Sequence, residues 1–236
     1  MKAKKTVSMK AVVVLLAAVL LVGGAVGGTL AWLLDSTDNV TNTFTVGDIN
    51  IDLKEHKLQE NGTLDNTASG EVNEVKTYKI LPGTKQPKDP FVRVKAGSEA
   101  CYLFVQVKEV NNTVGTGKYV GWKIADGWTQ VGTTANGVST YYKEQDALTA
   151  TDAADAVHFV LKGDTDYTTG VVTYADTLTK ANIEALDADA DKTVEENEMP
   201  QLIFKAFAVQ AEAGATAAEA WTKVPTNAYL GAVVTP

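Results

Sequence analysis

Carboxylates at alternating positions are the first residues in this sequence whose spacing suits a chemical role. Asp187, Asp189 and Asp191 occupy positions 1, 3 and 5 of a twelve-residue run that ends at Glu198. This is the oxygen spacing of a calcium-binding loop, in which carboxylates surround the cation. Position 6 is Lys192, where such loops place a glycine for a sharp turn. The run therefore indicates either a Ca²⁺ site or an acidic, solvated loop.

Residues typical of catalytic centres are few. The chain has two histidines, His56 and His158, and one cysteine, Cys101. The sequence contains neither the H-E-x-x-H pattern of most metalloproteases nor the G-x-S-x-G elbow of many serine hydrolases. His158 and Cys101 lie in apolar, strand-like runs, where packed side chains are expected and burial makes a thiol unreactive. The sequence therefore favours a protein that is not an enzyme.

Aromatic residues gather in the Gly- and Thr-rich middle of the chain. They are Tyr119, Trp122, Trp128, Tyr141 and Tyr142. Exposed rings on a β-sandwich can stack on sugars, which would make the protein a glycan-binding surface adhesin. The alternative is ordinary core packing, in which aromatic side chains bury large apolar areas.

Strand patterns dominate the elements that must position these residues. Residues 41–53 alternate with period two, and residues 100–110 are apolar on both faces, as in a central strand. A hairpin is expected between 91–95 and 100–110, and residues 55–74 read as a polar loop. Further short strands are expected at 75–80, 119–124, 138–143, 157–161, 170–174 and 201–210.

Two helical segments interrupt these strands. Residues 176–186 form a short amphipathic stretch, and Thr216 with Glu219 is the capping box of a helix that runs to Trp221. Many short strands with turn residues between them predict an all-β antiparallel sandwich with one or two short helices. No internal repeat or break in composition divides residues 32–236, so we expect a single domain.

Residues 1–31 have the organisation of a signal peptide. A start with four lysines is followed by the apolar run Ala11–Val22 and a small-residue exit, with cleavage expected between Ala31 and Trp32. The alternative is a retained membrane anchor, because residues 11–34 carry no charge. The four glycines in this stretch and the short apolar run favour cleavage and export.

The composition excludes several partners. The net charge of the whole chain is −8. Without the four lysines of the leader, 17 basic and 29 acidic residues remain, which gives a net charge of −12. A protein this acidic repels nucleic acid and anionic membranes, so we expect neither as a partner once the leader is removed. With Cys101 as the single cysteine, an intramolecular disulfide is excluded.

Four stretches resemble the TasA/camelysin family of secreted proteins. They are Gly28–Ile49, Leu81–Gly83, Ala96–Val107, and Ile203–Ala211 together with Ala217–Trp221. The resemblance implies a jelly-roll-like sandwich, cleaved by a dedicated signal peptidase of the SipW type and exported to the cell surface or extracellular matrix. It further implies a structural subunit of biofilm-matrix fibres, whose partners are further copies or other fibre subunits.

The resemblance also implies a role for residues 32–46. Cleavage would free this segment to be donated as a strand to the next subunit, with main-chain hydrogen bonds giving affinity. Its assembly residues would be Trp32, Leu33, Leu34, Val40, Phe44 and Val46. The alternative is that the segment forms the first edge strand of its own sheet. A glycan-binding adhesin is the competing function, and a metalloprotease, which the family's annotation history suggests, is the least favoured.

Overall fold

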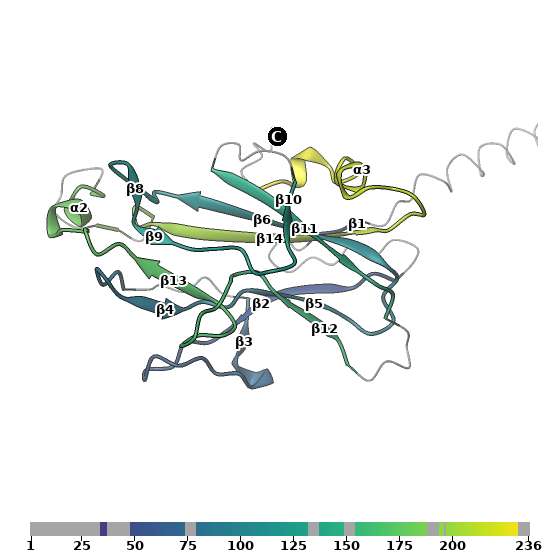
Figure 1. Cartoon of the computed structure of the whole chain (residues 1–236), viewed down its shortest axis with the longest axis horizontal. Coiled ribbons are helices and arrows are strands. Elements are labelled where there is room, and N and C mark those ends of the chain that lie inside the picture. The colour runs from purple at the N-terminus through teal and green to yellow at the C-terminus, as the bar shows by residue number, and fades with distance from the viewer. Residues whose placement is uncertain are drawn as a thin grey trace, which may run out of the picture.

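The computed structural model describes residues 34–36, 48–73, 79–131, 137–148, 154–187, 194–195 and 197–230, the first of these by backbone alone. Antiparallel strands are the main regular elements of this part of the chain, together with two short helices (Figure 1). The predicted all-β antiparallel class is therefore confirmed, and the sheets pack in a sandwich-like manner. The jelly-roll topology stays a prediction.

The larger sheet has five strands in the order β1-β14-β6-β11-β10. Their bounds are β1 Leu34–Ser36, β6 Cys101–Val110, β10 Thr129–Gln130, β11 Val138–Gln145 and β14 Gln201–Gln210. β6 lies in the middle, as its two apolar faces predict, and its residues from Cys101 to Val107 are all buried. It pairs with β14 along its whole length, from Cys101 opposite Gln210 to Val110 opposite Gln201.

The second layer lies beneath the larger sheet in Figure 1. Its four-stranded sheet has the order β12-β5-β2-β3, with β2 Ile51–His56, β3 Glu71–Val72, β5 Phe91–Val94 and β12 Ala156–Phe159. A three-stranded sheet has the order β4-β13-β9, with β4 Lys85–Pro87, β9 Val120–Gly121 and β13 Val171–Tyr174. Strands β7 Thr113–Val114 and β8 Gly117–Lys118 form a hairpin.

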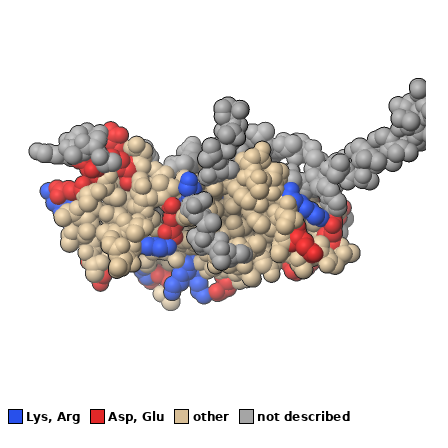
Figure 2. Space-filling view, turned by 90° about the horizontal axis from the view of Figure 1, so that it is seen from above, with Lys and Arg blue, Asp and Glu red and all other residues tan. Residues whose placement is uncertain are grey.

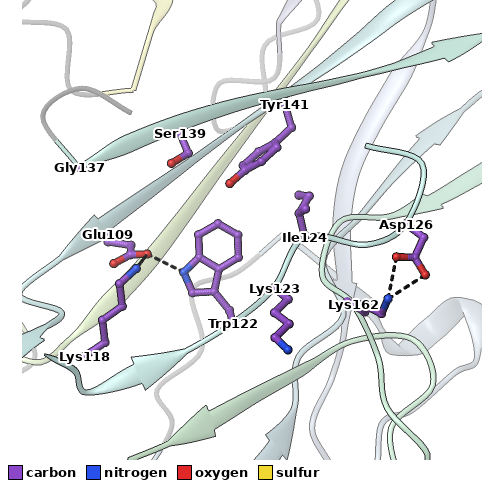
Figure 3. Close-up of a pocket in the computed structure, with 10 residues that line it drawn as sticks. All are labelled: Glu109, Lys118, Trp122, Lys123, Ile124, Asp126, Gly137, Ser139, Tyr141 and Lys162. Carbon is purple, nitrogen blue, oxygen red and sulfur yellow. Dashed lines mark hydrogen bonds and ion pairs between the residues drawn. The ribbon is translucent and has the colours of Figure 1, made fainter. Parts of the chain in front are cut away.

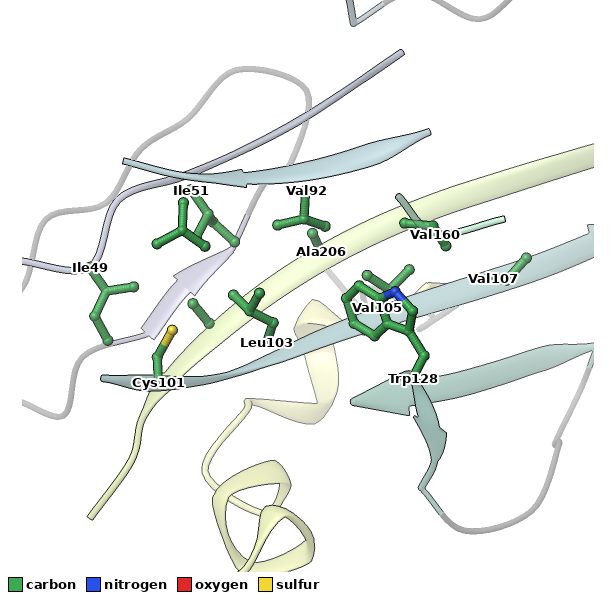
Figure 4. Close-up of a cluster of buried hydrophobic side chains, with 12 residues drawn as sticks. Ile49, Ile51, Val92, Cys101, Leu103, Val105, Val107, Trp128, Val160 and Ala206 are labelled. Carbon is green, nitrogen blue, oxygen red and sulfur yellow. The ribbon is translucent and has the colours of Figure 1, made fainter. Parts of the chain in front are cut away.

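The main core fills the space between the two layers (Figure 4). Ile51 and Val92 of the smaller sheet point toward Leu103 and Val105 of β6, and all four are fully buried. Alternate residues of a strand point to one face, so the period-two pattern of these strands supplies this layer. Each such side chain stabilises the fold by about 1.5–3 kcal/mol.

The outer face of the larger sheet is covered by helix α3, Ala217–Trp221. The ring of Trp221 lies 5.0 Å from that of Phe104 and 5.5 Å from that of Phe207, measured between centroids. The capping box predicted for Thr216 and Glu219 is present, because each side chain accepts a backbone N–H of the other residue. This part of the helix prediction is confirmed.

The other helix is shorter than predicted. α2 spans Lys180–Glu184 and begins after Thr179, which forms a capping box with Asn182. An N-cap residue has an extended backbone, so the helix cannot continue back to residue 176. Short 3₁₀ turns cover Ala68–Gly70 and Thr226–Ala228.

The predicted hairpin between 91–95 and 100–110 is wrong. β5 pairs with β2 and β12, whereas β6 pairs with β14 and β11 in the other layer. The intervening turn, in which Gly97 has a φ of +86°, carries the chain from one layer to the other. The predicted loop at 55–74 is also wrong at its ends, because β2 continues to His56 and β3 begins at Glu71. The predicted strand at 75–80 lies mostly outside the described residues.

Candidate functional site

The N-terminal strand β1 forms one edge of the larger sheet. Its residues Leu34, Asp35 and Ser36 pair antiparallel with Val209, Ala208 and Phe207 of β14. β6 pairs with the other side of β14, so β14 lies between β1 and the centre of the sheet. We call this pairing of β1 with β14 the β1 seam.

The β14 side of the seam is buried on both faces. Ala206 and Ala208 belong to the core between the layers, and Phe207 and Val209 belong to the cluster under α3. All four are at most 2 % exposed. The seam therefore joins a three-residue strand to a strand that both cores hold in place.

The seam contains one of the predicted assembly residues, Leu34, which lies opposite Val209. The other assembly residues and the predicted cleavage bond lie outside the described residues; these are Ala31, Trp32, Leu33, Val40, Phe44 and Val46. The pairing with β14 of the same chain corresponds to the alternative in which this segment forms an edge strand of its own sheet.

A pocket of about 630 Å³ opens at the other end of the larger sheet (Figure 3). β11 contributes Ser139 and Tyr141, which lie opposite Val107 and Val105 of β6 and so share the face that carries the main core. Glu109 of β6 and Trp122, which follows β9, line it as well. The pocket thus continues the main core at its end, where polar groups replace aliphatic ones.

Hydrogen bonds fix Trp122 in this pocket. Its indole Nε1 donates to Glu109 Oε1 at 2.8 Å, and its ring meets that of Tyr141 edge-on, with centroids 6.3 Å apart. Glu109 also pairs with Lys118 and accepts a hydrogen bond from Asn112 Nδ2 at 3.2 Å. The carboxylate therefore has three donors and holds the indole in one orientation.

Asn112 also fixes the chain next to Trp122. This buried side chain accepts the Val120 N–H at 2.7 Å and donates to the Val120 carbonyl at 2.9 Å. It thereby fixes β9 relative to β6, two residues before Trp122. The position of the indole is set by tertiary contacts on both sides.

The remaining aromatic residues of the middle region pack elsewhere. Tyr119 is buried and donates its hydroxyl to the Asn182 carbonyl at 2.7 Å, and Trp128 is buried with its indole N–H on the Phe159 carbonyl at 2.9 Å. Tyr142 lies on the outer face against Tyr102 and Phe104. Of the five aromatic residues proposed for stacking on sugars, the structure brings Trp122 and Tyr141 together in a pocket.

The charged residues of this pocket were missed by the sequence reading. Lys118, Lys123, Asp126 and Lys162 line it with Glu109. Lys118 and Lys123 flank the aromatic run 119–122, and this adjacency was the available signal. Lys162 and Glu109 reach the pocket from distant parts of the chain, so no local pattern could have indicated them.

The histidines take part in buried contacts. His56 Nδ1 lies 2.7 Å from Asp89 Oδ2, and the His56 N–H donates to Asp89 Oδ1 at 3.1 Å. Burial raises the pKa of the Asp89 carboxyl, although its hydrogen bonds to His56 oppose that change. Beside this pair, Lys88 and Glu55 form a buried ion pair of 2.8 Å. The sequence reading placed Glu55 and His56 in a solvated loop and so missed this cluster.

Neither His158 nor Cys101 has the properties of a catalytic group. Burial, with a smaller effect of Lys143, lowers the pKa of His158 to about 4, and its Nε2 lies 2.6 Å from Gln145 Oε1. Burial raises the pKa of the Cys101 thiol to about 12, which keeps it protonated and unreactive. Both positions agree with the packed roles expected from the sequence.

The structure describes the two ends of the proposed calcium-binding loop but not its middle. Asp189 and Asp191 lie outside the described residues, while Asp187 follows α2 and Glu198 Oε2 accepts the Glu195 N–H at 3.0 Å. Within the described ranges, His, Cys, Asp and Glu side chains do not gather in threes that could hold a metal ion. The calcium site stays a prediction.

Comparisons with known proteins give no indication of the function. No protein-family model, curated protein or solved structure matches this chain. In the part of the chain that the structure describes, no helix has the length and apolar character needed to cross a bilayer.

Proposed function

We propose that this chain is a secreted structural subunit of cell-surface or biofilm-matrix fibres of the TasA/camelysin type. Removal of the leader would free the N-terminal segment, which is then donated to a neighbouring copy. The observation that supports this most is the β1 seam, because β1 begins at the third residue after the predicted cleavage bond and lies at a sheet edge.

Strand pairing of this kind does not depend on which copy supplies the strand. The antiparallel register that joins β1 to Phe207–Val209 within one chain is equally available between two chains. Each backbone hydrogen bond adds only about 0.5–1.5 kcal/mol, so a three-residue pairing can be exchanged without unfolding the sheet. Exchange leaves the buried β14 platform unchanged and links one subunit to the next.

Cleavage is the natural control of this step. While the leader stays in the membrane, the segment before β1 is tethered and cannot pass to a second copy. The dedicated signal peptidase is therefore a required partner, and membrane contact ends with cleavage. Because Cys101 is buried, subunit contacts rely on strand pairing and packing, not on disulfides.

Cysteine pairs test the exchange directly. In a Cys101→Ala background, one exported chain carries Leu34→Cys and a second carries Val209→Cys, two positions that face each other in the seam. Facing residues on paired strands bring their Cβ atoms close enough for a disulfide. We expect oxidation of assembled mixtures to give covalent dimers that join the two variants, measured on non-reducing gels.

The matched control pairs Leu34→Cys with Ala208→Cys. Ala208 is one residue out of register, so its side chain points to the opposite face of the sheet and should not crosslink. Fibres imaged by electron microscopy from cleaved protein, and not from uncleaved protein, complete the test. The proposal fails if disulfides form only inside a chain that carries both Leu34→Cys and Val209→Cys.

A further inference from the structure

The pocket beside β11 combines two aromatic rings with a surplus of lysine side chains, and it belongs to neither the seam nor an established site. We propose that it binds an acidic saccharide, a sugar unit that carries a carboxylate. This role goes beyond the fibre proposal and does not depend on it. A matrix protein with both features would link a fibre to an acidic sugar unit.

The rings supply the surface on which a sugar ring packs. Pyranose rings present a face of C–H groups, and the electron-rich face of an indole or phenol attracts such groups. The indole N–H of Trp122 already donates to Glu109, so the indole offers its apolar surface rather than a hydrogen bond. Trp122 and Tyr141 both line the pocket and are held edge to face before any ligand arrives.

The charges supply the preference for an acid. Three lysines and two carboxylates line the pocket, which leaves a surplus of one positive charge in a chain whose net charge is −8. Glu109 is occupied by its three donors, and Asp126 pairs with Lys162 at 2.7 Å. The negative charge of each carboxylate is therefore balanced by a paired lysine, so these groups do not prevent an anion from binding.

Lys123 supplies this surplus charge, whereas Lys118 and Lys162 pair with the two carboxylates. Lys118 has a side chain that is 53 % exposed, with its ammonium 6.0 Å from the Trp122 ring centroid, at the outer limit of a cation–π contact. Lys123 is exposed, and its ammonium makes no ion pair with the residues that the structure describes. Lys123 lines the pocket together with Trp122, so its ammonium is the charge that we expect to meet the carboxylate of a bound sugar. Figure 3 shows Lys118 and Lys123 on opposite sides of the indole, Lys118 beside Glu109 and Lys123 toward Ile124.

The net charge and the surface favour a short ligand over a long polyanion. Stacking on aromatic rings beside lysines also suits single-stranded nucleic acid, but any long polyanion, nucleic acid or polysaccharide, would meet the field of a protein with a net charge of −8. The face in Figure 2 mixes acidic and basic side chains among larger uncharged areas, which gives a long polyanion no continuous basic track. The size of the pocket suits a small ligand, because such sites measure about 300–1,000 Å³.

The test uses the full-length chain and oligogalacturonate. Titration is followed by calorimetry and by tryptophan fluorescence, and the methyl-esterified form of the same oligomer serves as the neutral comparison. We expect saturable binding of the acid, weakened by salt, with binding of the ester about tenfold weaker. Equal affinity for acid and ester, or no binding of either, would overturn the proposal. Tighter binding of poly-L-glutamate or oligothymidylate would overturn it as well.

Variants locate the site. Lys123→Gln should weaken oligogalacturonate binding by about tenfold without affecting the fold, since this side chain is exposed and makes no ion pair with described residues. Lys57→Gln removes the same charge from an exposed position outside the pocket and should leave binding unchanged. Trp122→Phe keeps an aromatic face and should retain part of the affinity, whereas Trp122→Ala should lose about thirtyfold.

These readouts are separate from those of the fibre proposal. When Lys123→Gln is added to the chains that carry Leu34→Cys and Val209→Cys, the disulfide between positions 34 and 209 of neighbouring copies should still form. Failure of that crosslink with intact sugar binding would remove the fibre proposal alone. Equal loss of sugar binding in Lys57→Gln and Lys123→Gln would remove the pocket proposal alone.

Discussion

The β1 seam and the saccharide pocket lie at opposite ends of the same sheet and are built by different means. At the seam, Phe207–Val209 of β14 pair with β1 on one side and with Tyr102–Phe104 of β6 on the other. At the pocket, Glu109 of β6 pairs with Leu202 at the other end of β14. The seam depends on backbone pairing over buried side chains, and the pocket depends on side chains that five separate segments supply.

This difference decides how each region responds to change. A seam made of backbone hydrogen bonds tolerates exchange of its partner but not loss of the strand beneath it. The pocket depends on the orientation of single side chains, so one substitution can alter it while the fold persists. The two proposed roles of this sheet, an assembly surface and a binding site, should therefore be open to separate disturbance.

The largest effect is expected from Phe207→Ala. Phe207 is fully buried, lies opposite Ser36 in the seam and packs its ring against Trp221. Its removal should lower the free energy of unfolding by about 3–5 kcal/mol, measured by chemical denaturation. Ile203→Ala, on the same strand but 36 % exposed, should change it by only about 0.5 kcal/mol. Equal losses of unfolding free energy in the two variants would show that the buried part of β14 beside the seam contributes no more to stability than an exposed part of the same strand.

A smaller effect on stability is expected from proline in β1. Neighbouring residues of an edge strand alternate in direction, so replacing both Leu34 and Asp35 by proline removes the N–H that faces β14. We expect the free energy of unfolding to fall by about 1–2 kcal/mol and fibre formation to be abolished. Sugar binding should stay unchanged.

Prolines at the opposite edge of the sheet are the matched control. β10 has two residues against the three of β1 and pairs with β11, so prolines at Thr129 and Gln130 break a similar amount of pairing. These variants should still form fibres, as seen by electron microscopy. Loss of fibres from both pairs of prolines would mean that any damage to the sheet stops assembly.

The seam was in part predictable from the sequence and the pocket was not, for physical reasons. Period-two alternation located β2 and β5, and two apolar faces placed β6 at the centre, because burial acts on local patterns. The capping boxes of α2 and α3 involve residues three apart and are likewise local. The first strand near the predicted cleavage bond was expected from the family resemblance and not from a local pattern.

Partner choice is a long-range property, and the sequence reading failed on it. The turn around Gly97 was predicted to close a hairpin, yet β6 joins the other layer, since alternation does not specify the neighbouring strand. The contact between Trp122 and Glu109 spans 13 residues, and Lys88 with Glu55 spans 33. These contacts exist because the layers bring distant segments together.

Glu109→Gln is expected to affect the pocket and spare the seam. The amide keeps the shape and an oxygen for the Trp122 N–H but loses the charge that pairs with Lys118. We expect a loss of about 1–2 kcal/mol in the free energy of unfolding and altered Trp122 fluorescence, with normal fibre formation. Glu144→Gln, at an exposed position of β11, is the control and should change none of these.

The smallest effect at neutral pH is expected from His158→Gln, which tests whether both regions depend on the second layer. His158 of β12 contacts Gln145 of β11 and thus joins the two layers. Its pKa in the folded protein is about 4, below the usual 6.5, so the unfolded chain binds the proton more readily. The stability that this histidine provides is therefore complete above pH 6.5 and is lost as the pH falls toward 4.

Denaturation midpoints measured across this pH window should fall on the acid side in the natural chain and fall less in His158→Gln. The ring titration, followed by NMR, should have its midpoint near pH 4, and Lys143→Gln should raise it because the neighbouring positive charge is removed. Since the second layer lies under both ends of the larger sheet, acid should weaken fibre formation and sugar binding together. A histidine midpoint near 6.5, or acid loss of one function alone, would contradict this dependence.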